Sequence, residues 1–450
     1  MRKVLILLIL VLPASLVCLS CGGSSSGSTG TTTGLKFRAF ITNSVSAGTG
    51  SAGIFVVNAQ LDERSAKVIS AGNTPGMMVV TPNKAQTLVF SGNGTQNSDN
   101  QFSVINNSAE SNAVSVHLPG MTESFVVSPD SNTVYFAVPT AAVVGQSPGL
   151  VGVMTLSNGA LTGQASVPAV HYLAINNSGN RLLGFSDNSD SVAVITPSLI
   201  GVGNPVSYIG GTGIFDRPVA AFFSSDDSTV FVVSCGAECG GIQAGVQQYN
   251  LVTNTLVASV ATPAGSVALL NGSTMYLAGT PFTGGVPSQP CTGQITAATT
   301  CGLLTILNLA TPISIINTTP IVITDGYHNR IALGSNGQLF IGARTCTEII
   351  PPVPPPTGAE TRGCLSIYNT LTTLVGSNLP GGVLVPPANG DVTGLQPIPT
   401  RTVTYVVQGG TLDIYDNTID ALEYNPNNPN NPGRIFGLVG QFYDVKTVDF

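Results

Sequence analysis

The sequence predicts an all-β fold: a single β-propeller of four-stranded blades. A short unit recurs about every 47 residues, with an apolar strand, a polar turn, a second apolar strand, a loop and a third strand. It is clearest in residues 76–90, 124–138, 172–185 and 219–233. The apolar runs are punctuated by 52 Gly and 30 Pro, the usual composition of strands and turns. A period of about 40–50 residues with four strands per unit is typical of propellers.

The first strand of each unit is expected to line the central channel, followed outward by the second, third and fourth. Polar turns rich in Asn, Asp, Ser and Gly separate the first strand from the second, as tight hairpins require. The innermost strands are predicted to centre on Val79, Val126, Ala174, Ala221, Leu269, Ala332, Thr393 and Thr447.

Eight blades are the favoured count, and seven are the alternative because the units after Leu269 are more widely spaced. The first unit has its second, third and fourth strands, near 37–41, 54–57 and 67–69, but no inner strand before them. The segment 443–450 is an inner strand with nothing after it. Pairing these two ends would complete one blade and remove both free sheet edges.

The N-terminus resembles an export signal. Arg2 and Lys3 precede an apolar stretch, 4–12, that is too short to span a bilayer. Residues 18–22 resemble a bacterial lipobox with Cys21 as the acylated residue, although Cys18 stands where an aliphatic residue is usual; plain secretion is the alternative. We expect a signal peptide at 1–20, a lipidated Cys21 with a flexible Gly/Ser/Thr tether at 21–36, and a propeller at 37–450.

Composition limits the partners. Only 8% of the residues are charged, the net charge is −7 and no basic cluster occurs, so nucleic acid is not an expected partner. Membrane contact is expected only through the lipid anchor, and no cofactor is expected. The protein is expected to be monomeric and exported to the cell envelope, anchored at the outer membrane, because Gly22 after the cysteine resembles an outer-membrane sorting signal.

The units 73–90 and 216–233 resemble the repeat of the YVTN/lactonase-like (YncE-like) β-propeller superfamily. In that repeat a proline-containing segment leads the inner strand, a polar turn follows, and an aromatic-rich second strand comes next. The resemblance covers roughly 37–450 and is weaker after the fifth blade. It implies a fold rather than an activity, because the superfamily includes lactone hydrolases, peptide- or DNA-binding proteins and surface proteins.

Six cysteines follow Cys21, and they fall into sequential pairs between the second and third strands of three successive blades. An exported chain meets an oxidising compartment, so three disulfides are expected. A zinc site is the alternative, although no His or acidic cluster accompanies the pairs. The expected disulfides join Cys235 to Cys239, Cys291 to Cys301 and Cys346 to Cys364.

The loops that hold these cysteines are also the long ones, namely 279–300 and 347–363, the latter with a polyproline segment at 351–356. In a propeller they emerge on the same face as the connections that lead into the inner strands. Insertions gathered on one face often mark a binding face, although loops also drift in length where nothing constrains them. The Asn/Pro run 425–432 would lie on the opposite face as a polar spacer.

Chemistry would be expected at the channel mouth, where the connections into the inner strands place side chains. Asp325, His328 and Arg330 form the most mixed cluster and could bind an anion or orient a carbonyl; a surface turn with a local salt bridge is the alternative. His117 is expected on an outer strand. The other weak catalytic candidates are His171, Asp216 and Arg217, and the remaining polar residues of these connections are Glu123, Asp391 and Asp444.

Catalysis is therefore left open, and the absence of a nucleophile elbow or a His-Glu-x-x-His motif disfavours it. The favoured function is a non-catalytic cell-envelope lipoprotein that binds a protein, peptide or surface polymer through the loop-rich face. A lactonase-like hydrolase acting at the channel mouth and a structural docking platform in an envelope assembly are the alternatives.

Overall fold

The computed structural model describes residues 31–44, 52–92, 99–291, 298–310, 312–349, 359–371, 383–386, 390–423, 433–435 and 437–450. The proposed signal peptide, Cys21, the tether up to residue 30, the polyproline segment 351–356 and the Asn/Pro run 425–432 lie outside these residues. Among the described residues no helix is both long enough and apolar enough to cross a membrane.

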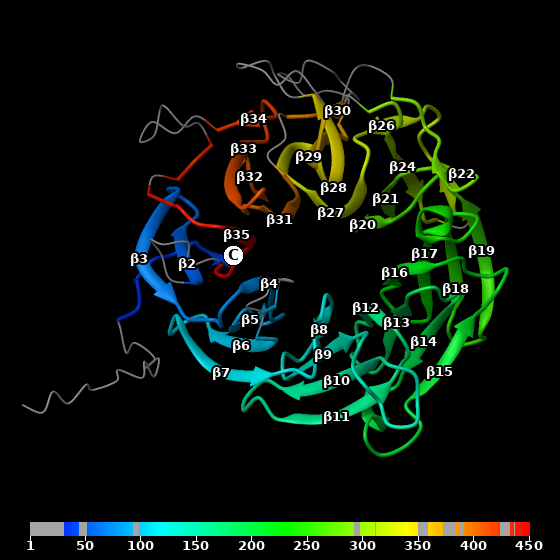
Figure 1. Ribbon diagram of the computed structural model, residues 1–450, viewed down its shortest axis with the longest axis horizontal. Helices are drawn as coiled ribbons and strands as arrows, with labels where there is room; N and C mark the ends of the chain where they lie inside the picture. Colours follow the sequence, from blue (N-terminus) through cyan, green and yellow to red (C-terminus); the bar gives the residue numbers. More distant parts are fainter. Residues whose placement is uncertain are drawn as a thin grey trace, which may run out of the picture.

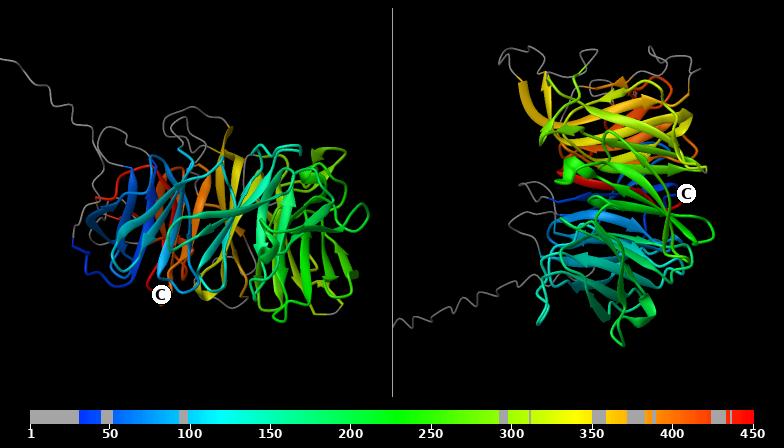
Figure 2. Two further views of the ribbon diagram at one scale, coloured as in Figure 1. Left: turned by 90° about the horizontal axis from the view of Figure 1, so that it is seen from below. Right: turned by 90° about the vertical axis from the view of Figure 1, so that its right-hand side faces the viewer.

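The chain forms an eight-bladed β-propeller, as predicted, and the seven-blade alternative is wrong (Figure 1). The blades follow one another around the ring in chain order, and the disc is seen edge-on in Figure 2. Each innermost strand contains the residue on which the sequence centred it. Four blades complete the first half of the ring. Blade 1 is β35 (Phe442–Thr447), β1 (Arg38–Asn43), β2 (Gly53–Asn58) and β3 (Glu63–Ile69); blade 2 is β4 (Pro75–Val80), β5 (Gln86–Ser91), β6 (Gln101–Asn106) and β7 (Ser111–His117); blade 3 is β8 (Phe125–Val127), β9 (Thr133–Val138), β10 (Leu150–Thr155) and β11 (Leu161–Ser166); blade 4 is β12 (Val170–Ile175), β13 (Leu182–Ser186), β14 (Ser191–Ile195) and β15 (Val206–Gly210).

The second half carries the altered units. Blade 5 is β16 (Pro218–Phe223), β17 (Thr229–Ser234), β18 (Gly245–Asn250) and β19 (Thr255–Ala261); blade 6 is β20 (Val267–Asn271), β21 (Thr274–Gly279) and β24 (Gly302–Asn308), with an outer edge split into β25 (Ser314–Ile315) and β26 (Ile321–Ile323); blade 7 is β27 (Tyr327–Leu333), β28 (Gln338–Ile349), β29 (Ala359–Asn369) and β30 (Val383–Leu384); blade 8 is β31 (Val392–Pro397), β32 (Val403–Gln408), β33 (Thr411–Asp416) and β34 (Ala421–Leu422). A small hairpin, β22 (Phe282–Thr283) and β23 (Val286–Pro287), and three 3₁₀ turns, η1 (Pro197–Leu199), η2 (Gly236–Cys239) and η3 (Ser335–Gly337), complete the elements.

Blade 1 closes the ring as the sequence predicted. The C-terminal strand β35 pairs antiparallel with β1, with Ala39 opposite Thr447 and Ile41 opposite Val445. In Figure 1 the red β35 lies at the inner side of the blue β2 and β3. The closure converts two chain ends into one complete sheet, so neither end leaves an unpaired inner edge.

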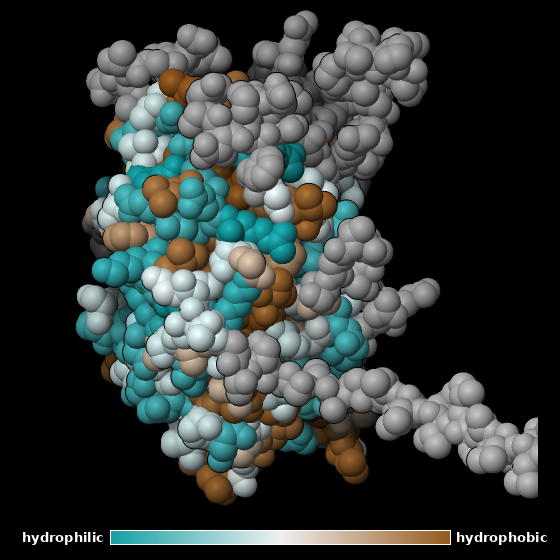
Figure 3. Space-filling view, turned by 90° about the vertical axis from the view of Figure 1, so that its left-hand side faces the viewer, coloured by the Kyte–Doolittle hydropathy of each residue, from teal (hydrophilic) through white to brown (hydrophobic). Residues whose placement is uncertain are grey.

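The hydrophobic core lies between neighbouring blades. Eight buried clusters each join the apolar residues of two adjacent blades. Second strands such as β5 are buried on both faces, whereas outer strands such as β3 and β7 alternate between buried and exposed residues. Seen from the side of blade 1, hydrophilic and hydrophobic residues are accordingly interspersed on the visible coloured surface (Figure 3). His117 ends the outer strand β7 and is exposed, as predicted.

The three predicted disulfides form, and they exclude the zinc alternative for these cysteines. Cys235 pairs with Cys239, Cys291 with Cys301 and Cys346 with Cys364, in blades 5, 6 and 7. The last pair corrects one expectation: the cysteines lie within β28 and β29, a hairpin that extends to Ile349 and resumes at Ala359, and not beside a wholly irregular loop. Disulfides indicate an oxidising, exported environment.

Candidate functional site at the channel mouth

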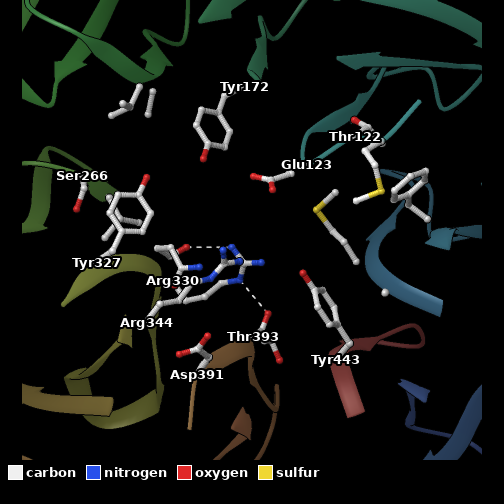
Figure 4. Close-up of a pocket in the computed structure, with 18 of the residues that line it drawn as sticks. Thr122, Glu123, Tyr172, Ser266, Tyr327, Arg330, Arg344, Asp391, Thr393 and Tyr443 are labelled. Atoms are coloured by element: carbon white, nitrogen blue, oxygen red, sulfur yellow. Dashed lines mark hydrogen bonds between the residues drawn. The ribbon is translucent and has the colours of Figure 1, made fainter. Parts of the chain in front are cut away.

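A pocket of about 520 Å³ occupies one mouth of the central channel. All eight blades contribute to its wall, each with residues at or just before the start of its innermost strand. Figure 4 shows several of these side chains converging on the open centre. In blade order they include Tyr443, Met77, Glu123, Tyr172, Val219, Ser266, Tyr327 and Asp391.

β-Bulges place many of these side chains. In six blades the pairing of the innermost strand with the second strand shifts register at this end. A bulge leaves one residue unpaired and turns it away from the regular alternation. The residues skipped by the register include Tyr443, Met77, Val219, Asn329 and Thr393, and all of them line the pocket.

Two arginines of blade 7 extend into the pocket and are held by these bulges. Arg330 donates from Nε to the carbonyl of Thr393 at 2.8 Å and from Nη1 to the carbonyl of Asn329 at 3.0 Å. With the Asn329 amide turned so that its oxygen faces Arg344, that oxygen accepts from Nε at 2.8 Å and from Nη2 at 3.2 Å. Neutral acceptors therefore orient both guanidinium groups without neutralising them.

Tyrosine hydroxyls lie opposite and beside the arginines (Figure 4). Tyr172 and Tyr327 are hydrogen-bonded through their hydroxyls, and burial raises the pKa of both. Tyr443 points into the pocket from blade 1. The Oγ1 atom of Thr393 is buried and lacks a hydrogen-bond partner within the described structure. The wall thus combines fixed cations with neutral hydroxyl donors.

His171 stands at the rim between two carboxylates. Its Nε2 lies 3.2 Å from Glu123 and its Nδ1 lies 2.9 Å from Asp187. The hydrogen bond with Glu123, together with that from Asp187, raises the pKa of His171 to about 9, and the same contact lowers the pKa of Glu123. His171 is therefore a cation at neutral pH and has no free lone pair with which to act as a base.

We expect the His171 ring to titrate well above the other two histidines in NMR of histidine-labelled protein. It should remain protonated at pH 7.5, whereas burial lowers the pKa of His328 to about 4 and keeps that ring neutral. Because the folded-state pKa of His171 exceeds the usual 6.5, its contribution to stability should be complete below pH 6.5 and lost as the pH rises through about 9. Asp187→Asn should lower the midpoint; a native midpoint at 6.5 or below would refute this account.

The cluster predicted at Asp325, His328 and Arg330 is separated by the structure. Only Arg330 lines the pocket. His328 is fully buried, with Nε2 2.9 Å from the carbonyl of Thr324. Asp325 accepts the backbone N–H of Thr347 with both oxygens, and burial raises its pKa.

The other candidates hold loops. Asp216 accepts two backbone N–H groups, those of Ile242 and Gln243, each at 2.7 Å. Arg217 pairs with Asp190 at 3.2 Å, and its carbonyl accepts the N–H of Cys235. These contacts join the disulfide loop of blade 5 to the connection into its inner strand, and they place both on the face that carries the pocket.

Arg344 is the main pocket residue that the sequence reasoning missed. It lies near the end of the second strand of blade 7, outside the connections that were searched. Tyr172 was noted only as a neighbour of His171, and its signal was an aromatic residue at the start of an inner strand. Within the described residues, no group of three or more His, Cys, Asp or Glu side chains could hold a metal ion.

No protein-family model and no curated protein matches the sequence. Solved structures do match in fold. The hydrazine synthase of Kuenenia stuttgartiensis is 13% identical with a TM-score of 0.53, over 77% of this chain and 96% of that one. The dihydro-heme d1 dehydrogenase NirN is 12% identical with a TM-score of 0.55, over 92% and 75% of the two chains. At such identities the similarity shows the fold alone. The chain is therefore a β-propeller protein.

Proposed function

We propose that the protein is a binding module of the cell envelope that takes an anionic group of its partner into the channel mouth. The observation that carries this proposal is the pair Arg330 and Arg344. Both guanidinium groups line the pocket, and neither forms an ion pair with a carboxylate within the described residues. Paired guanidinium groups with fixed orientations favour carboxylate or phosphate oxygens.

The remaining steps of the proposal follow the sequence. The signal peptide at 1–20, acylation of Cys21 and a tether before the propeller at 37–450 would place the ring at the outer membrane. The repeat resembles that of the YVTN/lactonase-like propellers, whose members include peptide-binding proteins. The disulfide loops on the pocket face support a role in contacting a protein, peptide or surface polymer by a single copy of the chain.

The test is the binding of a simple carboxylate, N-acetylalanine, followed by ligand-observed NMR. The double variant Arg330→Gln, Arg344→Gln should weaken binding at least about tenfold, equivalent to 1.4 kcal/mol, because both charged donors are lost. Arg181→Gln, a change at the hairpin turn of blade 4, is the matched control and should bind as the native protein does. Equal binding by the double variant would show that the channel mouth is not the anion site.

Hydrolysis at the channel mouth is the second candidate, and one carboxyl group favours it. Burial raises the pKa of Glu238 to about 7, suitable for a general acid or base, and Glu238 accepts the N–H of Thr280 at 2.9 Å close to Tyr327. It does not line the pocket itself. Turnover of simple lactones by the native protein, abolished in Glu238→Gln, would establish this function in place of simple binding.

A further inference from the structure

A second cavity adjoins the channel mouth. It measures about 320 Å³ and lies between blades 4 and 5. Its own lining includes Phe185, Ser186, Asp187, Arg217 and Pro218, and we call it the outer pocket. It shares three wall residues with the channel-mouth pocket, namely Tyr172, Val219 and Tyr327. The two cavities are therefore neighbours across a common wall and open on the same face of the ring.

The shared wall is built from one hydroxyl pair and one bulged residue. Tyr172 and Tyr327 are hydrogen-bonded through their hydroxyls, which fixes both rings at the boundary. Val219 is the residue that the register of β16 skips, so the bulge turns it toward both cavities. A ligand that crosses from one cavity to the other would pass over aromatic and aliphatic surface flanked by hydroxyl groups.

Each cavity has a buried polar atom without a hydrogen-bond partner among the described residues. In the channel mouth this atom is Oγ1 of Thr393, and in the outer pocket it is Nε of Arg217, whose Nη1 is bound to Asp190. Buried polar atoms are nearly always satisfied, and an orphan donor costs about 1–3 kcal/mol. Both atoms are placed to meet a ligand: Oγ1 could meet an oxygen atom of the anion, and Nε could donate to a carbonyl.

We propose that the two cavities form one groove that binds the free carboxyl end of an extended peptide. This inference rests on the proposed function and names its ligand class. The terminal carboxylate would lie between Arg330 and Arg344, the backbone would cross the Tyr172–Tyr327 pair, and a residue further back would enter the outer pocket. There the Arg217 Nε would donate to a backbone carbonyl beside the apolar walls formed by Phe185 and Pro218.

Charge and length favour a peptide end over other chains. The protein carries a net charge of −7, so a polyanion would be repelled while a single carboxylate can still pair with the local arginines. Capture of a terminal carboxylate is an established mode of peptide recognition. Four extended residues span roughly 13 Å, which suits two cavities that share a wall.

The test compares three probes by calorimetry: N-acetylalanine, the acetylated tetrapeptide Phe-Ala-Ala-Ala with a free carboxylate, and the same tetrapeptide as its amide. We expect the tetrapeptide acid to bind about tenfold more tightly than N-acetylalanine, and the amide to lose most of that affinity. Ser186→Trp, which fills the outer pocket, should reduce the tetrapeptide to the affinity of N-acetylalanine without changing N-acetylalanine itself. Ser157→Trp, an exposed serine of the opposite face, is the matched control.

The outcomes separate the two proposals. If N-acetylalanine binds through the arginines but the tetrapeptide acid binds no more tightly, the groove is wrong and the anion site stands. If neither acid binds, the proposed function fails as well. Tighter binding of an oligomer of glucuronic acid than of the tetrapeptide would overturn the peptide assignment in favour of a surface polymer. The probe series needs no variant, so it remains decisive even if Ser186→Trp does not fold.

Discussion

Replacing Val445 by aspartate is expected to open the propeller ring. Val445 is fully buried in β35, opposite Ile41 of β1, within the cluster that packs blade 8 against blade 1. The change removes an apolar side chain worth about 1.5–3 kcal/mol of burial and adds a carboxylate with no partner. A loss of about 4–5 kcal/mol in the free energy of unfolding is therefore expected, at the upper end for one substitution.

The closing strand also holds blade 2, which adds to the expected effect. Asp444 accepts the backbone N–H of Met78 at 2.8 Å, and Asp449 accepts from Arg38. Disordering β35 would break contacts to three blades at once. Urea unfolding with limited proteolysis measures the effect, and Val439→Asp is the matched control because Val439 is 76% exposed. Equal unfolding midpoints for the two variants would show that closure through β35 does not stabilise the ring.

The strand order and the closure could be predicted because they depend on a pattern repeated along the chain. Each unit carries its own turn residues and apolar runs, and the missing inner strand near Arg38 matches the unpaired strand near Val445. The three disulfides could be predicted for a similar reason: each cysteine lies near its partner, between the same two strands of a blade.

The site was harder to predict because bulges change which residues face the channel. Strict alternation along β27 would put Tyr327 and Asn329 on one side and His328 and Arg330 on the other. The register shift between His328 and Arg330 lets both Asn329 and Arg330 reach the pocket, while His328 stays buried. Nothing in the residue types at these positions signals a bulge.

The second half of the pocket depends on contacts between elements that are distant in sequence. Arg344 meets Asn329 only because β28 pairs with β27, and Arg330 meets Thr393 only because blade 8 follows blade 7 around the ring. A search along single loops finds neither contact. The adjoining outer pocket arises in the same way, from the packing of blade 4 against blade 5.

The second large effect is expected at the other side of the seam, where Arg401 of blade 8 bridges two acidic side chains. Arg401 donates to both oxygens of Asp62 in blade 1, at 2.7 and 2.8 Å, and to Glu423 at 2.9 Å. The Tyr405 hydroxyl also donates to Asp62. The side chains of Arg401 and Asp62 are only 15% and 11% exposed, so water can do little to replace a lost partner.

Arg401→Met is expected to cost about 3–5 kcal/mol at pH 7, because it leaves two partly buried carboxylates facing each other without a cation. Burial, followed by the charge of Asp62, already raises the pKa of Glu423 to about 7, and removal of Arg401 should raise it further. A carboxyl group whose folded-state pKa is raised binds more protons in the folded protein than in the unfolded protein. Stability of the variant should therefore fall as the pH rises from about 5 to 8, and acidification to pH 5 should restore part of the loss.

Chemical unfolding at pH 5, 7 and 8 measures both the cost and its pH dependence. Arg181→Met is the matched control, because Arg181 forms no ion pair within the described residues, and it should change stability by less than about 0.5 kcal/mol. The double variant Arg401→Met, Asp62→Leu should be more stable than Arg401→Met alone, because the carboxylate left without its cation is then gone and only Glu423 must be neutralised or solvated. A double variant less stable than the single one, or a cost of Arg401→Met that is the same at pH 5 and pH 8, would mean that Arg401 stabilises the seam through packing of its side chain and not through its charge.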